Sequence, residues 1–153
     1  NRFAKKIITG LNGTINQKKI TLLGWAFKKD TNDSRESAAI YVADILLEEG
    51  AELHVYDPMV KGTRIHQDLT FLWEARNVSK HEVAAKLKRC VVHVDHKTAL
   101  EGSFAAAILT EWDEFVSYDW ETIVEKMIQP AKILDGRNVL QENESINQYF
   151  IGK

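Results

Sequence analysis

Two short segments carry the cationic side chains that could bind an anionic ligand. Residues 27–35 (FKKDTNDSR) place Lys28, a second lysine and Arg35 in one polar stretch directly after an apolar run, and Arg137 follows another apolar run within an Asp-Gly-Arg turn. Lysine, arginine and the free N–H groups at the start of a helix are the groups that bind phosphate. Charge alone favours a solvated loop for residues 27–35, and Arg137 could equally pair with Asp135 at the surface. Whether these segments form a ligand site therefore depends on where the fold places them.

Short apolar runs alternate with helical patterns along the chain. This alternation predicts an α/β domain with a Rossmann-like, open, mostly parallel sheet and helices on both faces. The expected strands are residues 19–27, 52–56, 90–94, 104–110 and 132–134, with one more in the tail at 148–151. The expected helices are residues 2–11, 35–49, 79–88, 96–100 and 118–127. Residues 59–77 show no clear pattern, and we expect them to cross the sheet edge as an irregular segment.

The helix expected over residues 35–49 has recognisable start and stop signals. Asp33 or Ser34 is expected to cap its free N–H groups, and Gly50 is expected to end it. This helix would begin directly after the cationic segment, so its first turn would contribute N–H donors beside Lys28.

The topology predicts that both cationic segments lie at one edge of the sheet. In an open parallel sheet, ligands bind beyond the carboxyl ends of the strands, where the strand order reverses. Residues 27–35 follow the first expected strand and Arg137 follows the last clear one. The two segments together therefore form the candidate ligand site.

The glycine-rich fingerprint of dinucleotide-binding domains is absent. Gly24 stands alone where three glycines are needed, and the bulky Trp25 and Phe27 would keep a pyrophosphate away from the backbone. The domain is therefore not expected to be the NAD-binding half of a dehydrogenase. Asp57 is interpreted as a turn residue before a proline, and Trp112 as a packing residue.

Composition and reactive side chains exclude several classes of function. Twenty Lys and Arg are scattered among 22 Asp and Glu, for a net charge of −2, so neither nucleic acid nor a membrane is expected as a partner. The longest apolar run, residues 104–109, is too short to span a bilayer. The single Cys90 excludes an intrachain disulfide, favours a reducing, cytoplasmic environment, and is interpreted as a buried structural thiol. The five histidines show no metal-ligand spacing, so we expect no catalytic residue and no metal site.

Residues 23–37 strongly resemble the C-terminal, UDP-binding domain of the UDP-glucose/GDP-mannose dehydrogenase family. The resemblance continues, in the family's order, through residues 56–58, 109–115, 135–138 and 151–153. It implies an enzyme that oxidises a nucleotide sugar twice with NAD. The Lys-Asp-Thr insert at residues 29–31 resembles the UDP-glucose 6-dehydrogenase branch more than the GDP-mannose and UDP-N-acetylmannosamine branches. UDP-glucose is therefore the expected substrate.

The family resemblance also implies roles for individual residues. Phe27, Lys28 and Arg137 match positions that contact the UDP-sugar, and Arg35 matches an arginine that reaches the NAD across an interdomain cleft. The family's catalytic thiolate, with its Lys and Asp helpers, and its NAD-binding domain match nothing here, Cys90 included. The chain by itself is therefore expected to bind the nucleotide sugar without turning it over.

We expect the chain to be the last part of a longer enzyme. Residues 1–16 are interpreted as the end of an interdomain helix and linker, and residues 17–153 as the UDP-sugar-binding domain. The helical stripe of Phe3, Ile7 and Leu11 needs a cover, either this domain's own sheet or a preceding domain. The expected partners are the NAD-binding and central domains within a homo-oligomer. A related nucleotide-sugar dehydrogenase domain and a stand-alone nucleotide-sugar-binding module remain alternatives.

Overall fold

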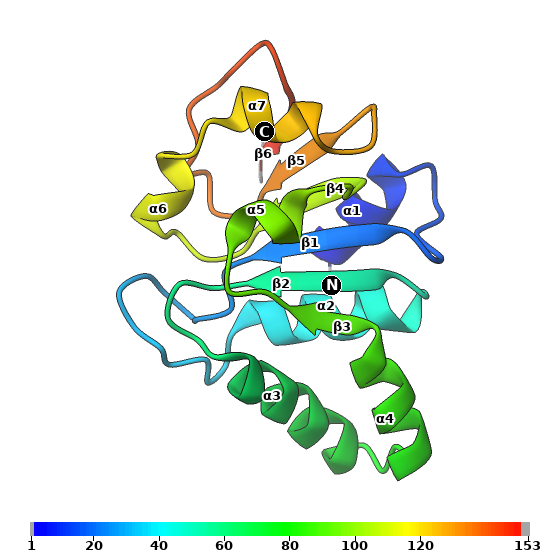
Figure 1. Ribbon diagram of the computed structural model, residues 1–153. Helices are drawn as coiled ribbons and strands as arrows, with labels where there is room; N and C mark the ends of the chain where they lie inside the picture. The colour runs from blue at the N-terminus through cyan, green and yellow to red at the C-terminus, as the bar shows by residue number, and fades with distance from the viewer. Residues whose placement is uncertain (1, 151–153) are drawn as a thin grey trace.

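The six strands that the structure describes lie side by side in one open sheet. The computed structural model describes residues 2–150. Every strand runs parallel to its neighbours, in the order β3-β2-β1-β4-β5-β6 (Figure 1). The strands are β1 (Lys19–Leu23), β2 (Glu52–Tyr56), β3 (Cys90–Val92), β4 (Ala105–Ile108), β5 (Lys132–Asp135) and β6 (Asn147–Phe150). The predicted Rossmann-like sheet is confirmed, and its order reverses between β1 and β4.

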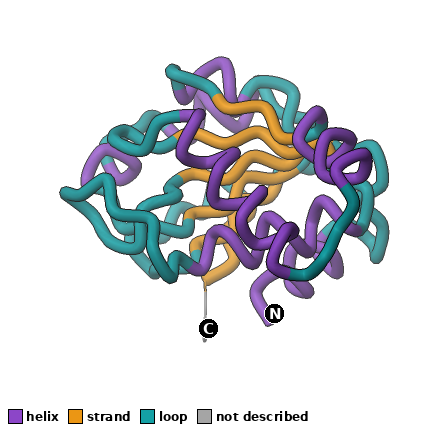
Figure 2. The backbone as a smooth tube through the Cα atoms, turned by 90° about the horizontal axis from the view of Figure 1, so that it is seen from below, coloured by secondary structure: helices purple, strands orange, loops and turns teal. Residues whose placement is uncertain are grey.

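Helices cover both faces of this sheet, as predicted (Figure 2). They are α1 (Arg2–Gly10), α2 (Ala38–Glu48), α3 (Gly62–Ala75), α4 (Lys80–Lys88), α5 (His96–Leu100), α6 (Asp113–Val116) and α7 (Trp120–Glu125). On one face α2 lies between α1 and α3, whereas α5 lies over β1 and β2 on the other face. Within residues 2–150, no helix has the length and apolar character needed to cross a membrane.

The first helix shares the core of the domain. Ala4 and Ile7 are fully buried and Leu11 is nearly so, and α1 packs against α2. The ammonium of Lys132 in β5 also donates a hydrogen bond to the carbonyl of Gly10 at the end of α1. The apolar stripe of this helix is therefore covered by the domain's own elements. Its assignment to an interdomain segment stays a prediction.

The expectation of an irregular segment over residues 59–77 is wrong, because most of it forms α3. This helix buries Ile65, Leu69 and Trp73, which are spaced four residues apart, and the Trp73 indole donates to Asp44 of α2 at 2.8 Å. Its N-cap residue, Lys61, makes no capping hydrogen bond with its side chain. The helix therefore lacks the usual start signal, and the single apolar stripe is the feature of the sequence that indicates it.

The start of α2 also differs from the prediction. Ser37 caps the helix by accepting a hydrogen bond from the Ala39 amide at 3.2 Å, so neither Asp33 nor Ser34 is the cap. Ser34 is fully buried, and its hydroxyl donates to Asp68 of α3 at 2.6 Å. The predicted end is confirmed, because Gly50 follows α2 with a left-handed φ of 88°.

Several strands are shorter than predicted at their carboxyl ends. The first strand ends at Leu23 rather than residue 27, because Gly24 turns the chain with a φ of 98°. The third and fourth strands end at Val92 and Ile108, two residues early in each case. The tail strand is present as β6, but its predicted last residue, Ile151, lies outside the described residues.

Candidate functional site

The backbone closes tightly at the point where the strand order reverses. A Cβ atom on Gly24, after β1, would lie 2.4 Å from the Thr110 hydroxyl oxygen, after β4. The same hydroxyl donates to the carbonyl of Ala26 at 2.7 Å, and the Trp25 side chain is fully buried. The turn after β1 thus packs closely against the chain after β4, and it lacks the glycines that let a pyrophosphate approach the backbone in dinucleotide-binding domains.

The carboxylate of Asp57, directly after β2, organises the loops around it. One oxygen accepts hydrogen bonds from the amides of Trp25 and Ala26 and from the Trp112 indole, at 2.6, 3.0 and 3.2 Å. The other accepts from the amides of residues 59 and 60 at 2.8 and 2.9 Å. The turn role predicted for Asp57 is confirmed, but the buried carboxylate also fixes the chain after β1. The predicted packing role of Trp112, which is 7% exposed, is also confirmed.

Glu111, in the loop between β4 and α6, brings the two predicted cationic segments together. Its Oε1 accepts a hydrogen bond from the Lys29 amide at 3.0 Å, and its Oε2 forms an ion pair with the Arg137 guanidinium at 2.8 Å. Lys29 belongs to the loop after β1 and Arg137 to the loop after β5. These loops gather at the carboxyl edge of the sheet, toward which the arrowheads of β1 and β2 point at the left of Figure 1.

The two adjacent lysines of the first loop differ in their partners. The Lys29 ammonium lies 3.2 Å from Asp113, and this hydrogen bond and charge raise the pKa of Lys29. The Lys28 ammonium lies 5.4 Å from the centre of the Phe27 ring, which is 40% exposed. Within residues 2–150, no carboxylate lies within ion-pair distance of Lys28. Lys28 therefore has the ammonium group that is available to an anionic ligand.

Arg35 lies in a different cleft from the other predicted site residues. This cleft runs between residues 31–35 and the start of α3, and it also contains Lys61 and Arg64. The exposed Arg35 guanidinium pairs with Asp33 at 2.8 Å, and these hydrogen bonds lower the pKa of Asp33 to about 2. The cleft therefore contains three cationic side chains, of which Arg35 pairs with Asp33 and Arg64 with Asp68.

Cys90 is a buried thiol, as the sequence predicts. Its side chain opens β3 with 2% exposure, and burial raises the pKa of Cys90 to about 12. A thiol with such a pKa is almost fully protonated near neutral pH, so it supplies no thiolate nucleophile.

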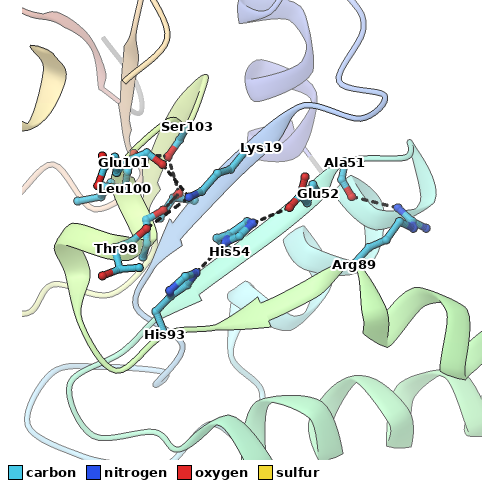
Figure 3. A network of polar contacts seen from close by, with 12 residues as sticks. Lys19, Ala51, Glu52, His54, Arg89, His93, Thr98, Leu100, Glu101 and Ser103 are labelled. Atoms are coloured by element: carbon cyan, nitrogen blue, oxygen red, sulfur yellow. Dashed lines mark hydrogen bonds and ion pairs between the residues drawn. The ribbon is translucent and has the colours of Figure 1, made fainter. Parts of the chain in front are cut away.

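Two of the five histidines lie together, although the sequence gives no sign of this. His54 Nδ1 lies 2.6 Å from His93 Nε2, and His54 Nε2 lies 3.0 Å from a carboxylate oxygen of Glu52 (Figure 3). Burial, the largest cause, lowers the pKa of both imidazoles. This histidine pair lies on β2 and just after β3, away from Glu111. Within residues 2–150, this cluster included, no group of three or more His, Cys, Asp or Glu side chains is arranged so that it could hold a metal ion.

The sequence analysis missed the carboxylates of this site. It identified the cations and assigned Asp57 to a turn, but Glu111 and Asp113 received no role. Both lie in the segment after β4 at the carboxyl edge, Asp113 as the first residue of α6, and this position is the one signal that could have indicated them. Their partners lie 26 to 84 residues away in the sequence, so spacing alone could not pair them.

The fold and the site define an open, parallel α/β domain whose candidate ligand-binding side chains, Lys28 and Arg137, lie on loops at the carboxyl edge of its sheet. Residues 21–142 match a family described as the UDP-glucose/GDP-mannose dehydrogenase family, UDP binding domain. The chain belongs to this family.

Relatives with curated names agree with this assignment. The chain is 45% identical over 148 residues to a UDP-glucose 6-dehydrogenase from Drosophila melanogaster, covering 96% of this chain and 30% of that protein. It is 47% identical over 139 residues to the Bos taurus UDP-glucose 6-dehydrogenase, covering 91% of this chain and 27% of that protein. The chain therefore spans less than a third of the length of these relatives.

Solved structures share the fold over nearly the whole chain. A UDP-D-ManNAc dehydrogenase from Pyrococcus horikoshii superposes with a TM-score of 0.72 at 27% identity, covering 99% of this chain and 30% of that one. A UDP-glucose dehydrogenase from Pyrobaculum islandicum gives a TM-score of 0.64 at 25% identity, covering 99% of this chain and 28% of that one.

Proposed function

We propose that this chain is the UDP-sugar-binding domain of a UDP-glucose 6-dehydrogenase, which oxidises UDP-glucose to UDP-glucuronate. The names of the relatives support this assignment. The observation that carries it is the contact of one carboxylate, Glu111, with both the loop of Lys28 and the side chain of Arg137. Two segments that the sequence predicts to bind one ligand are thereby held at one edge of the sheet.

The chemical role of the domain is to bind and orient the nucleotide sugar. The Lys28 ammonium and the Arg137 guanidinium offer charge and N–H donors to the diphosphate or to sugar hydroxyls. The exposed Phe27 ring offers an apolar surface to the base or the sugar. Holding the substrate in one orientation converts binding energy into the correct approach of the reacting carbon.

The proposed hydride acceptor is NAD, held mainly by a domain outside this chain. The turn after β1 does not fit a dinucleotide, because it has a single glycine where three are needed and packs against Thr110. The cleft that contains Arg35, Lys61 and Arg64 supplies cationic side chains for the dinucleotide's negatively charged diphosphate, and Arg35 would make that contact. Since Cys90 is protonated and buried, the nucleophile required between two oxidation steps would also come from elsewhere.

Calorimetric titration of the 153-residue chain with UDP tests the site. The wild-type chain is expected to bind UDP without turning over UDP-glucose, and the Lys28→Ala, Arg137→Ala double variant is expected to lose that binding. Lys29→Ala is the matched control, because its ammonium already pairs with Asp113 and its loss should change affinity much less. Unchanged binding by the double variant would refute the assignment of these residues.

A sibling nucleotide-sugar dehydrogenase is the second candidate. The superposition on a UDP-D-ManNAc dehydrogenase is at least as good as that on a UDP-glucose dehydrogenase. Rates of the complete enzyme on UDP-glucose, GDP-mannose and UDP-N-acetylmannosamine separate the candidates, and preference for either of the last two would contradict our proposal.

The proposal extends to the whole protein. We expect residues 1–16 to connect this domain to central and NAD-binding domains within a cytoplasmic homo-oligomer. The mass of the intact gene product and its sedimentation in solution test this. A gene product of this chain alone would instead support a stand-alone nucleotide-sugar-binding module.

A further inference from the structure

We propose that Glu111 is a positioning residue that couples the two halves of the UDP site. This inference rests on the proposed function, because it assigns a role to a residue that holds the predicted ligand contacts without being one of them. Its basis is the way in which the two carboxylate oxygens divide between two loops.

The position of Glu111 relative to the sheet explains why it contacts both loops. It follows β4, which lies between β1 and β5 in the strand order. One carboxylate oxygen accepts from the Lys29 amide on the β1 side, and the other accepts from the Arg137 guanidinium on the β5 side. The side chain is 28% exposed, so water competes only partly for these contacts.

Both contacts act on groups that would meet the ligand. The bond to the Lys29 amide fixes the backbone next to Lys28. The bond to Arg137 restrains a long side chain, whose other nitrogen also lies 3.5 Å from the Leu109 carbonyl. Restraining such a side chain before binding removes part of the entropy cost of ordering it on the ligand. Glu111 therefore pre-organises the site.

An opposite effect of Glu111 is also physically reasonable, and the two effects differ in sign. A carboxylate close to a diphosphate repels it, so a purely repulsive Glu111 would weaken UDP binding. Here the adjacent guanidinium compensates its charge, and both oxygens already accept hydrogen bonds. We therefore expect the positioning effect to dominate.

Glutamine is the informative substitution at this position. It has nearly the same size as glutamate but only one acceptor oxygen, and its amide nitrogen is a donor. In Glu111→Gln, one of the two loops therefore loses its acceptor and faces a donor instead. Because an uncharged acceptor also binds a guanidinium more weakly, the coupling between the loops is reduced whichever way the amide turns.

A double-mutant cycle tests the proposal, with UDP as the probe and calorimetry as the measurement. Glu111→Gln should weaken UDP binding about fivefold to tenfold in the wild-type background and less than about twofold in Arg137→Ala, because residues that act through one another are not additive. If UDP binding by Arg137→Ala falls below detection, Arg137→Lys takes its place, again with a smaller effect than in wild type. Glu125→Gln, at an exposed glutamate of α7, is the control and should leave affinity unchanged.

The outcomes separate the two proposals. If the wild-type chain does not bind UDP, the proposed function fails. If it binds UDP but Glu111→Gln has the same effect in both backgrounds, or tightens binding, the positioning role is wrong and the proposed function stands. Urea unfolding of each variant must show an intact fold, so that a loss of affinity cannot come from unfolded protein.

Discussion

Two polar regions of this domain use their side chains in opposite ways. At the carboxyl edge, the carboxylates of Asp57 and Glu111 accept hydrogen bonds from backbone amides of other loops. On the face of β2 and β3, the pair of His54 and His93 is linked only through side chains, with Glu52 at its end (Figure 3). The carboxylates of the first region therefore determine loop conformation. The side chains of the second region lie on or beside strands whose positions backbone hydrogen bonds already fix.

The difference shows that polarity alone does not mark a functional region. Both regions contain carboxylates and cations or imidazoles within hydrogen-bond distance. Only at the carboxyl edge do the polar groups join segments that follow different strands, which is where ligands bind in this class of fold. Removing groups from each region should therefore have very different consequences.

The largest effect is expected from Asp57→Ala. This substitution leaves four buried or partly buried amides and an indole N–H without their acceptor, so the free energy of unfolding should fall by about 3 kcal/mol or more. Urea denaturation measures the change, and Asp57→Asn should fall between this variant and wild type. The control is Asp30→Asn at an exposed residue with a φ of 63°, which asparagine tolerates. A loss below 1 kcal/mol in Asp57→Ala would contradict the view that the carboxylates of the carboxyl edge fix the loops.

A smaller loss is expected from Glu114→Ala, also at the carboxyl edge. The same Glu114 oxygen accepts from the Tyr56 hydroxyl at 2.7 Å and from the Tyr118 hydroxyl, and burial and these contacts raise the pKa of both phenols. Without this acceptor the domain should lose about 1–2 kcal/mol of stability. Glu114→Gln keeps one acceptor oxygen and should lose much less. Equal losses in the two variants would show that charge, rather than the acceptor, matters.

The contribution of the histidine pair to stability should depend on pH. Because the folded state lowers the pKa of His54 and His93, the unfolded chain takes up protons below about pH 6.5 that the folded chain binds less readily. Stability should therefore fall as pH decreases from 7 toward 5, and more steeply in wild type than in His93→Gln. His81→Gln, at an exposed histidine of α4, is the control and should keep the wild-type slope. An unchanged slope in His93→Gln would contradict the prediction.

The smallest effect is expected from Asp113→Asn. The Lys29–Asp113 ion pair is exposed, with side-chain exposures of 44% and 83%, so its loss should not measurably change the unfolding midpoint. The pKa of Lys29 should fall toward its ordinary value, because Asp113 is the main cause of its increase. An NMR titration of the lysine side chain measures this shift. A clear loss of stability would mean that the ion pair also helps to fix the loop.

The sheet and most helices could be predicted because their signals are local. Continuous apolar runs indicate strands buried on both faces, and Ser79 caps α4 from the predicted position, accepting from the Glu82 amide at 3.2 Å. The helix α3 was missed because Lys61 provides no side-chain cap. The cap of α2 was misplaced because Ser34 bonds instead to Asp68, a residue of that same unrecognised helix.

The candidate site was predictable in part for the same reason. Cations after strands are visible in the sequence, and Lys28 and Arg137 indeed lie on loops joined by one carboxylate. The carboxylate itself was not visible, because its role depends on which strands become neighbours. The strand order places β4 between β1 and β5, and only that order makes Glu111 a bridge.

The close approach of Gly24 to Thr110 has a consequence for how substitutions would be tolerated. Any side chain at position 24 would collide with Thr110, with the nearest atom at 2.4 Å, and would also require an unfavourable φ of 98°. Thr110 directly precedes Glu111, so the collision would displace the residue that joins the two loops. A mutational scan scored by UDP binding would therefore rank position 24 among the most sensitive, although a glycine there has no side chain to offer a ligand.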